Sequence, residues 1–122
     1  MDQKDRITDQ PHVISVCTRC VDTTARRRPG ERVIAQLSDH LSGGFRVVGV
    51  DCLAGCGNTC VVSYAAPGKA TWVFGNITSS DLPDLVSFAQ QYAGSHDAWF
   101  RGRDCPPKLC DNTLARVPGV GA

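Results

Sequence analysis

The chain has 122 residues, which suffices for one domain with a modest hydrophobic core and is too short for two. Hydrophobic residues make up 42% and charged residues 20%, as in ordinary globular proteins, and the net charge of +1 does not indicate a nucleic-acid partner. No apolar stretch approaches the roughly 20 residues that span a bilayer, and the polar start MDQKDRITDQPH does not read as a secretory signal. We therefore expect a cytoplasmic protein without a membrane contact, in a compartment that keeps thiols reduced.

The first half of the chain predicts a strand–helix–strand unit behind a polar arm. Residues 1–11 are expected to be flexible, and the β-branched run HVISV at 12–16 predicts a strand. After Pro29, apolar residues recur at helical spacing and a glycine pair follows them, which predicts a helix. The members of this stripe are Val33, Ile34, Leu37 and Leu41. FRVVGV at 45–50 predicts a second strand, and the length of the unit favours a parallel pair.

The second half predicts a hairpin, a second helix and a tail. CVVSY at 60–64 and ATWVFGN at 70–76 flank the turn signal AAPGK, which favours a β-hairpin. Ser80 opens a second helix that ends at Gly94. Its apolar stripe contains Leu82, Leu85, Val86, Ala89 and Tyr92. Residues 95–122 have scattered prolines and glycines without periodicity, so we expect a coil tail packed on the domain.

The predicted element order is β-α-β-β-β-α. Strands that alternate with helices in this way indicate an α/β fold with a mixed sheet, and the succession fits a thioredoxin-like architecture. The domain organisation we expect is a flexible arm at 1–11, one thioredoxin-like domain at 12–94 and a coil tail at 95–122.

Seven cysteines are the most informative residues of the chain. An odd number in a reducing compartment argues against a disulfide framework. Cys17 and Cys20 follow the first predicted strand, and Cys52 and Cys56 follow the second. If those strands are parallel neighbours, their ends deliver four thiolates to one edge of the sheet. The glycines of CLAGCGN favour a tight ligand loop over a helix.

Four thiolates suit two kinds of inorganic centre, and the spacing leaves both open. Zinc takes four cysteines tetrahedrally and is then structural. A [2Fe–2S] cluster also takes four cysteines and carries one electron. A third interpretation rests on CTRC at 17–20, which is also the pattern of a thioredoxin-type dithiol. Its distance of about nine residues from the predicted helix argues against this, because the helix N-terminus would be needed to lower a thiol pKa.

The order of strand, CxxC, strand, CLAGC, hairpin and helix resembles the thioredoxin-like [2Fe–2S] ferredoxins. It is also similar to the related cluster-bearing subunit of respiratory NADH dehydrogenase, whose second cysteine pair has the form CLGAC. The sequence is more similar still to the DUF1636 family of small predicted metal-binding proteins. The features shared with that family are CxxC, CLxxCxxxC, the W-x-F-G strand at 72–75 and RVP at 116–118, so the resemblance covers about residues 12–118.

The resemblance implies a [2Fe–2S] cluster held by Cys17, Cys20, Cys52 and Cys56. The ferredoxins generally have a longer gap in their first cysteine pair than the two residues found here, which leaves a place for Cys60. That thiol is an alternate ligand, a neighbour of the cluster, or a small buried apolar residue that opens the hairpin strand. Cys105 and Cys110 bracket PPKL in the tail, where they can pair under oxidation but need no function.

The function that the resemblance implies is one-electron transfer by a small carrier that is not an enzyme. Its partners would be a reductase and an acceptor, in cobalamin or corrinoid metabolism by family association, and the ferredoxins suggest a homodimer. The alternatives are a zinc-stabilised binding module without a redox role and a thiol–disulfide oxidoreductase.

Overall fold

The computed structural model describes residues 12–18, 30–41, 45–50, 60–100 and 104–119. The strands are β1 (His12–Cys17), β2 (Phe45–Val50), β3 (Val62–Ala65), β4 (Thr71–Phe74) and β5 (Thr113–Val117). The helices are α2 (Gly30–His40), α3 (Leu82–Gly94) and α4 (Pro107–Asp111), and a 3-10 turn, η1 (Ser79–Asp81), leads into α3. The order from β1 to α3 is the predicted one, although both strands of the hairpin are shorter than their apolar runs.

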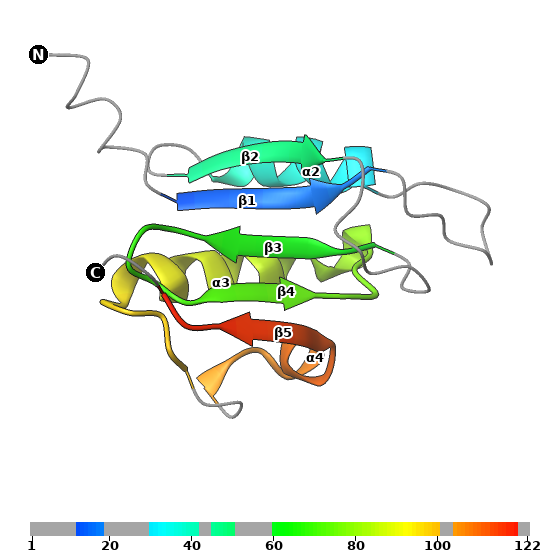
Figure 1. Ribbon diagram of the computed structural model, residues 1–122. Coiled ribbons are helices and arrows are strands. Elements are labelled where there is room, and N and C mark those ends of the chain that lie inside the picture. The colour runs from blue at the N-terminus through cyan, green and yellow to red at the C-terminus, as the bar shows by residue number, and fades with distance from the viewer. Residues whose placement is uncertain (1–11, 19–29, 42–44, 51–59, 101–103, 120–122) are drawn as a thin grey trace, which may run out of the picture.

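The described strands form one five-stranded sheet in the order β2-β1-β3-β4-β5 (Figure 1). β1 and β2 run parallel, as the strand–helix–strand unit predicts, and the other neighbours in the sheet are antiparallel. The mixed α/β class is therefore confirmed. Since β1 lies between β2 and β3, the end of β1 at Cys17 has a strand or its extension on either side.

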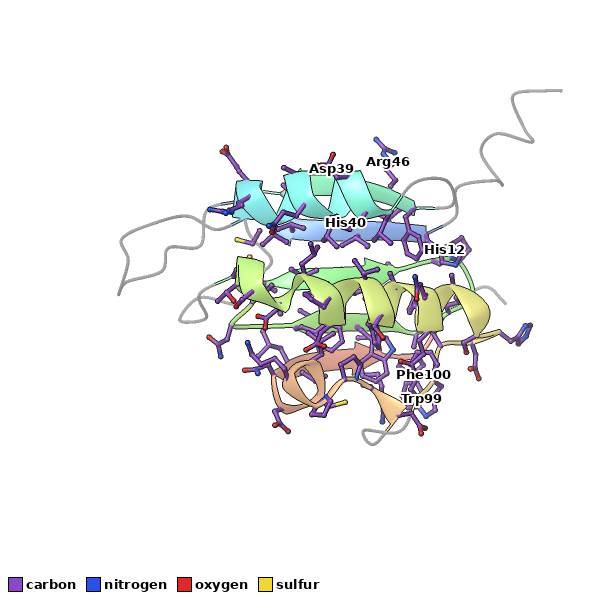
Figure 2. All side chains as sticks on the ribbon, turned by 180° about the vertical axis from the view of Figure 1, so that it is seen from behind. His12, Asp39, His40, Arg46, Trp99 and Phe100 are labelled. Atoms are coloured by element: carbon purple, nitrogen blue, oxygen red, sulfur yellow. The ribbon has the colours of Figure 1, made fainter. Side chains whose placement is uncertain are left out.

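The two longer helices, α2 and α3, cover the same face of the sheet (Figures 1 and 2). Alternation along β1 directs Ile14 and Val16 to one face, and both side chains are buried. They share a hydrophobic cluster with Val33 and Leu37 of α2. The apolar stripe predicted for this helix therefore packs on the sheet. None of the helices in the described ranges combines the length and the apolarity needed to cross a membrane.

Aromatic side chains pack between α3 and the hairpin. The ring centroid of Phe88 lies 4.8 Å from that of Tyr64 and 5.0 Å from that of Phe74, with edge-to-face geometry in both pairs. Phe88 is fully buried, although the stripe predicted for α3 did not include it. It follows Leu85 by three residues and precedes Tyr92 by four, so the same helical period accounts for it.

Two buried phenols tie the core to the backbone and should make the fold sensitive to alkali. Tyr64 donates to the carbonyl of Leu85 at 2.8 Å, and Tyr92 donates to that of Ala70 at 2.6 Å. Burial raises the pKa of Tyr64, and it raises the pKa of Tyr92 from 10.0 to about 12. Because the folded pKa exceeds the unfolded one, the stability that these groups contribute is complete below pH 10 and is lost as the pH rises through 12.

We expect the urea midpoint of unfolding to fall steeply between neutral pH and pH 12. Tyr92→Phe should cost about 1 kcal/mol of stability at neutral pH, because one buried hydrogen bond is lost. In the same variant the alkaline fall should be smaller than in the wild type, because one buried ionisable group is gone. An equal midpoint at neutral pH and at pH 12 would contradict this assignment.

The segment that follows α3 differs from the prediction of a coil tail. It contains α4 and the strand β5, which pairs antiparallel with β4 at the edge of the sheet, with an irregularity between Val73 and Phe74. Lys108 of α4 makes an ion pair of 2.8 Å with Asp81 of η1. The carbonyl of Asn112 accepts a hydrogen bond from the amide of Gly75 at 2.9 Å. The tail therefore adds a strand to the sheet, and contacts with η1 and with Gly75 fix the two ends of α4.

Candidate metal centre at the ends of β1 and β2

Cys17 is the last residue of β1 and lies beside the last residue of β2. The parallel register pairs Cys17 with Val50. The pairing continues by one residue, because the amide of Thr18 donates to the carbonyl of Val50 at 2.9 Å and its hydroxyl does so at 3.1 Å. On the other side, the amide of Cys17 donates to the carbonyl of Val61 at 2.9 Å. Cys17 is therefore fixed at the end of an inner strand, and its side chain is 1% exposed.

Cys60 lies next to Cys17, although 43 residues separate them in the sequence. The sulfur of Cys60 is 4.0 Å from the carbonyl oxygen of Cys17, which is a weak S–H···O contact. Its side chain is fully buried in the hydrophobic cluster, and its carbonyl accepts a hydrogen bond from the amide of Ile77 at 3.1 Å. This burial agrees with a small core residue beside the candidate centre. A ligand role for Cys60 remains a prediction.

The other three predicted ligands, Cys20, Cys52 and Cys56, lie outside the described residues. The structure does place the points from which their segments depart. Residues 19–29 follow Thr18, and residues 51–59 follow Val50. Those two departure points are hydrogen-bonded to each other. Within the described ranges, His, Cys, Asp and Glu side chains do not form a group of three or more that could hold a metal ion.

The start of α2 also reaches this edge. A methyl group placed on Gly30, the first residue of α2, would lie only 2.1 Å from the carbonyl oxygen of Cys17. The helix therefore begins in direct contact with the end of β1, which only a residue without a side chain permits. Sequence separation alone had placed the helix N-terminus away from Cys17, and that expectation is wrong. The glycine at the helix start was the available signal.

One protein family matches both the strands that form this edge and the tail. A family model described as a protein of unknown function, DUF1636, matches residues 14–119. The chain belongs to the DUF1636 family. No curated protein and no solved structure matches this DUF1636 protein. The matched range includes all seven cysteines.

The tail cysteines of the DUF1636 protein lie in a different part of the fold. Cys105 lies just before α4 and Cys110 lies within it. The helix precedes β5, which β3 and β4 separate from β1 in the sheet. The two thiols hydrogen-bond to each other, and Cys105 is buried. Burial, and then the contact with Cys110, raises the pKa of Cys105 to about 12. In the described structure this pair is thus distinct from the candidate centre at Cys17.

Proposed function

We propose that this DUF1636 protein is a small one-electron carrier that holds a [2Fe–2S] cluster with Cys17, Cys20, Cys52 and Cys56. The observation that supports it best is the register of the parallel pair, which aligns Cys17 with Val50. Cys52 follows Val50 by two residues and Cys20 follows Cys17 by three, so both thiol-bearing segments begin at the same edge. A cluster bound there would supply transfer of a single electron.

Residues around the proposed cluster would support it in three ways. Backbone pairing with β2 on one side and with Val61, just before β3, on the other holds the end of β1, which makes Cys17 a rigid first ligand in this proposal. Cys60 fills the space behind it with an apolar thiol and keeps water from that side. The sequence CLAGCGN favours a tight loop, and backbone amides of such a loop would donate hydrogen bonds to sulfur and tune the potential of the centre.

The wider parts of the proposal follow the resemblance to thioredoxin-like ferredoxins. A parallel β1–β2 unit followed by an antiparallel β3–β4 hairpin and a helix is the succession on which this resemblance rests. We extend the proposal to a reductase and an acceptor as redox partners, in corrinoid metabolism by family association. A homodimer and a reducing, cytoplasmic setting belong to the same proposal.

Two alternatives to the electron carrier each have a specific observation in their favour. Zinc is the first, because four thiolates at one edge would hold it as well as they would hold iron. A thiol–disulfide oxidoreductase is the second, because α2 begins against the carbonyl of Cys17. A helix N-terminus near a CxxC motif is the setting that activates such thiols.

Anaerobic purification followed by metal and sulfide analysis tests the proposal. We expect a red-brown protein that bleaches with dithionite and holds about two irons and two sulfides per chain. The reduced protein should give the electron-paramagnetic signal of a single unpaired electron. A colourless protein that holds one zinc would contradict the electron-carrier proposal and favour a zinc-stabilised module. A metal-free protein whose Cys17 and Cys20 cycle between dithiol and disulfide would favour the oxidoreductase.

A further inference from the structure

The pair formed by Cys105 and Cys110 takes no part in the proposed electron carrier, yet its two thiols are in contact with each other. Cys105 precedes Pro106, the residue that caps α4, and Cys110 lies in the last turn of the helix. The two prolines between them restrict the backbone, and the two thiols are in hydrogen-bond contact. Two thiols in contact can form an intrachain disulfide once their sulfurs reach bonding distance.

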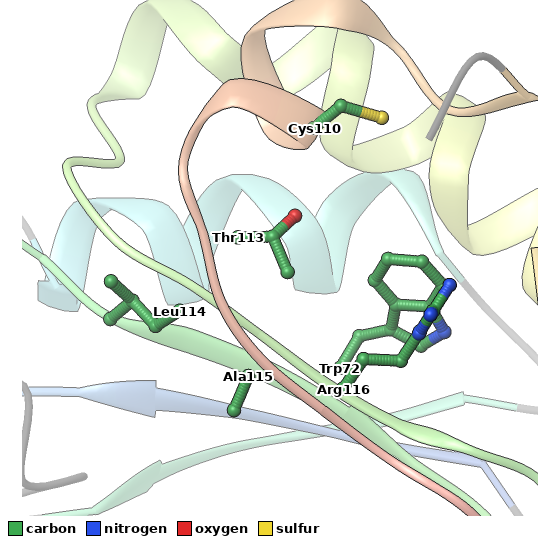
Figure 3. Close-up of a pocket in the computed structure, with 6 residues that line it drawn as sticks. All are labelled: Trp72, Cys110, Thr113, Leu114, Ala115 and Arg116. Atoms are coloured by element: carbon green, nitrogen blue, oxygen red, sulfur yellow. The ribbon is translucent and has the colours of Figure 1, made fainter. Parts of the chain in front are cut away.

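The two thiols differ in their access to solvent. Cys105 is 6% exposed and belongs to the hydrophobic cluster, whereas Cys110 is half-buried and packs against that cluster from outside. Cys110 also lines an open pocket of about 360 Å³ (Figure 3). A molecule that enters this pocket meets Cys110 first, and Cys105 can then be reached through Cys110.

The pocket carries a positive charge that aromatic rings hold in place. Arg116 lines it, and the guanidinium carbon lies 3.9 Å from the ring centroid of Trp99 and 5.5 Å from that of Trp72. One nitrogen of this group donates to the carbonyl of Phe100 at 2.6 Å. Figure 2 shows Trp99 and Phe100 on the β5 side of the fold. A guanidinium has five N–H donors, so donors remain for a carboxylate in the pocket.

We propose that Cys105 and Cys110 form a thiol–disulfide exchange site for small anionic disulfides. The Cys110 thiolate attacks one sulfur of the disulfide, the S–S bond breaks, and the departing thiolate takes up the proton that Cys110 has lost. Cys105 then attacks the sulfur of Cys110 and displaces the second half of the substrate, which takes up the proton of Cys105. The protein loses two electrons in forming one intrachain disulfide, and the substrate gains two electrons in becoming two thiols.

The division of roles follows from burial. Attack on a disulfide needs a thiolate that can meet its target. Cys110 lines the pocket, while burial and the contact with Cys110 keep Cys105 protonated at neutral pH. Cys105 is therefore the resolving thiol, which acts once Cys110 carries the mixed disulfide. Arg116 would attract the carboxylates of the substrate, and this attraction should weaken as salt screens the charge.

Peptide mapping of the whole protein tests the site directly. The reduced chain is incubated with oxidised glutathione, blocked with an alkylating agent and digested with trypsin. Cleavage after Lys108 places the two cysteines in separate peptides, 104–108 and 109–116. We expect these peptides to be joined by a disulfide, and the link to disappear on treatment with a reductant. This result does not depend on whether the protein carries a cluster, so the two proposals fail separately.

Single variants assign the order of events. In Cys105→Ser, or in Cys105→Ala if serine destabilises the core, Cys110 should accumulate one glutathionyl group. In Cys110→Ser, Cys105 should stay unmodified over the same time in the folded protein. Equal modification of both single variants, or failure of peptides 104–108 and 109–116 to link in the wild type, would overturn the proposal.

The role of the Arg116 charge is tested by comparing the reaction rates with an anionic and a neutral disulfide. Arg116→Gln should slow the reaction with oxidised glutathione about threefold or more at low salt, relative to the reaction with the neutral hydroxyethyl disulfide. Arg116→Lys should retain most of the preference, because it keeps the charge. Circular dichroism shows whether each variant is folded. An unchanged ratio of the two rates in folded Arg116→Gln would remove the anionic specificity from the proposal.

Discussion

Cys17→Ser should abolish the visible absorption of the proposed [2Fe–2S] centre and lower the iron content at least about tenfold, since a missing thiolate leaves one iron under-coordinated. The fold should survive, because backbone hydrogen bonds hold this residue between the neighbours of β1 on both sides. Absorption spectra and iron analysis of anaerobically purified protein measure the effect. Cys52→Ser and Cys56→Ser are expected to behave alike.

Variants of the remaining cysteines serve as matched controls for this loss. Cys105→Ser and Cys110→Ser should keep the absorption, because α4 lies beside β5 (Figure 1), and β3 and β4 separate β5 from the strand that carries Cys17. Cys60→Ala should also keep it, with a shift of the spectrum at most, since Cys60 contacts the carbonyl of Cys17 from within the core. Colour lost in a tail variant would place a ligand in the tail, and colour retained in Cys17→Ser would exclude the ligand set proposed.

Apolar periodicity predicted the elements whose packing depends on their own residues. Val33 and Leu37 repeat at helical spacing and face the sheet, and the β-branched runs at 12–16 and 45–50 form the parallel pair. The parallel pairing also predicted that Cys17 lies at the edge where both strands end. These features are local, or follow from a single rule about strand–helix–strand units.

The features that sequence reasoning missed depend on contacts between distant segments. The strand β5 has only five residues, and Leu114 and Val117 are about half exposed, so alternation gave no signal. Its place is set by pairing with β4 and by the contact of Arg116 with Trp72. The neighbourhood of Cys17 and Cys60 likewise depends on the β1–β3 pairing, which the sequence pattern did not address.

Gly30→Ala should destabilise the fold by about 1–3 kcal/mol, the range found when atoms are forced into a packed site. The added methyl group would lie 2.1 Å from the carbonyl oxygen of Cys17 and 3.0 Å from its carbonyl carbon. Both atoms belong to an inner strand that neighbouring backbone holds on two sides, so they cannot move aside as a flexible side chain would. α2 must therefore shift away from the end of β1, and urea unfolding measures the cost.

Gly94→Ala is the matched control, because nothing lies within 4 Å of a methyl group at the last residue of α3. This variant should be neutral or more stable by up to about 1 kcal/mol, as alanine favours helix over glycine. If the end of β1 also positions the metal ligands, Gly30→Ala should bind less iron than Gly94→Ala in the same preparation. Equal stability of the two variants would show that α2 does not depend on its contact with Cys17.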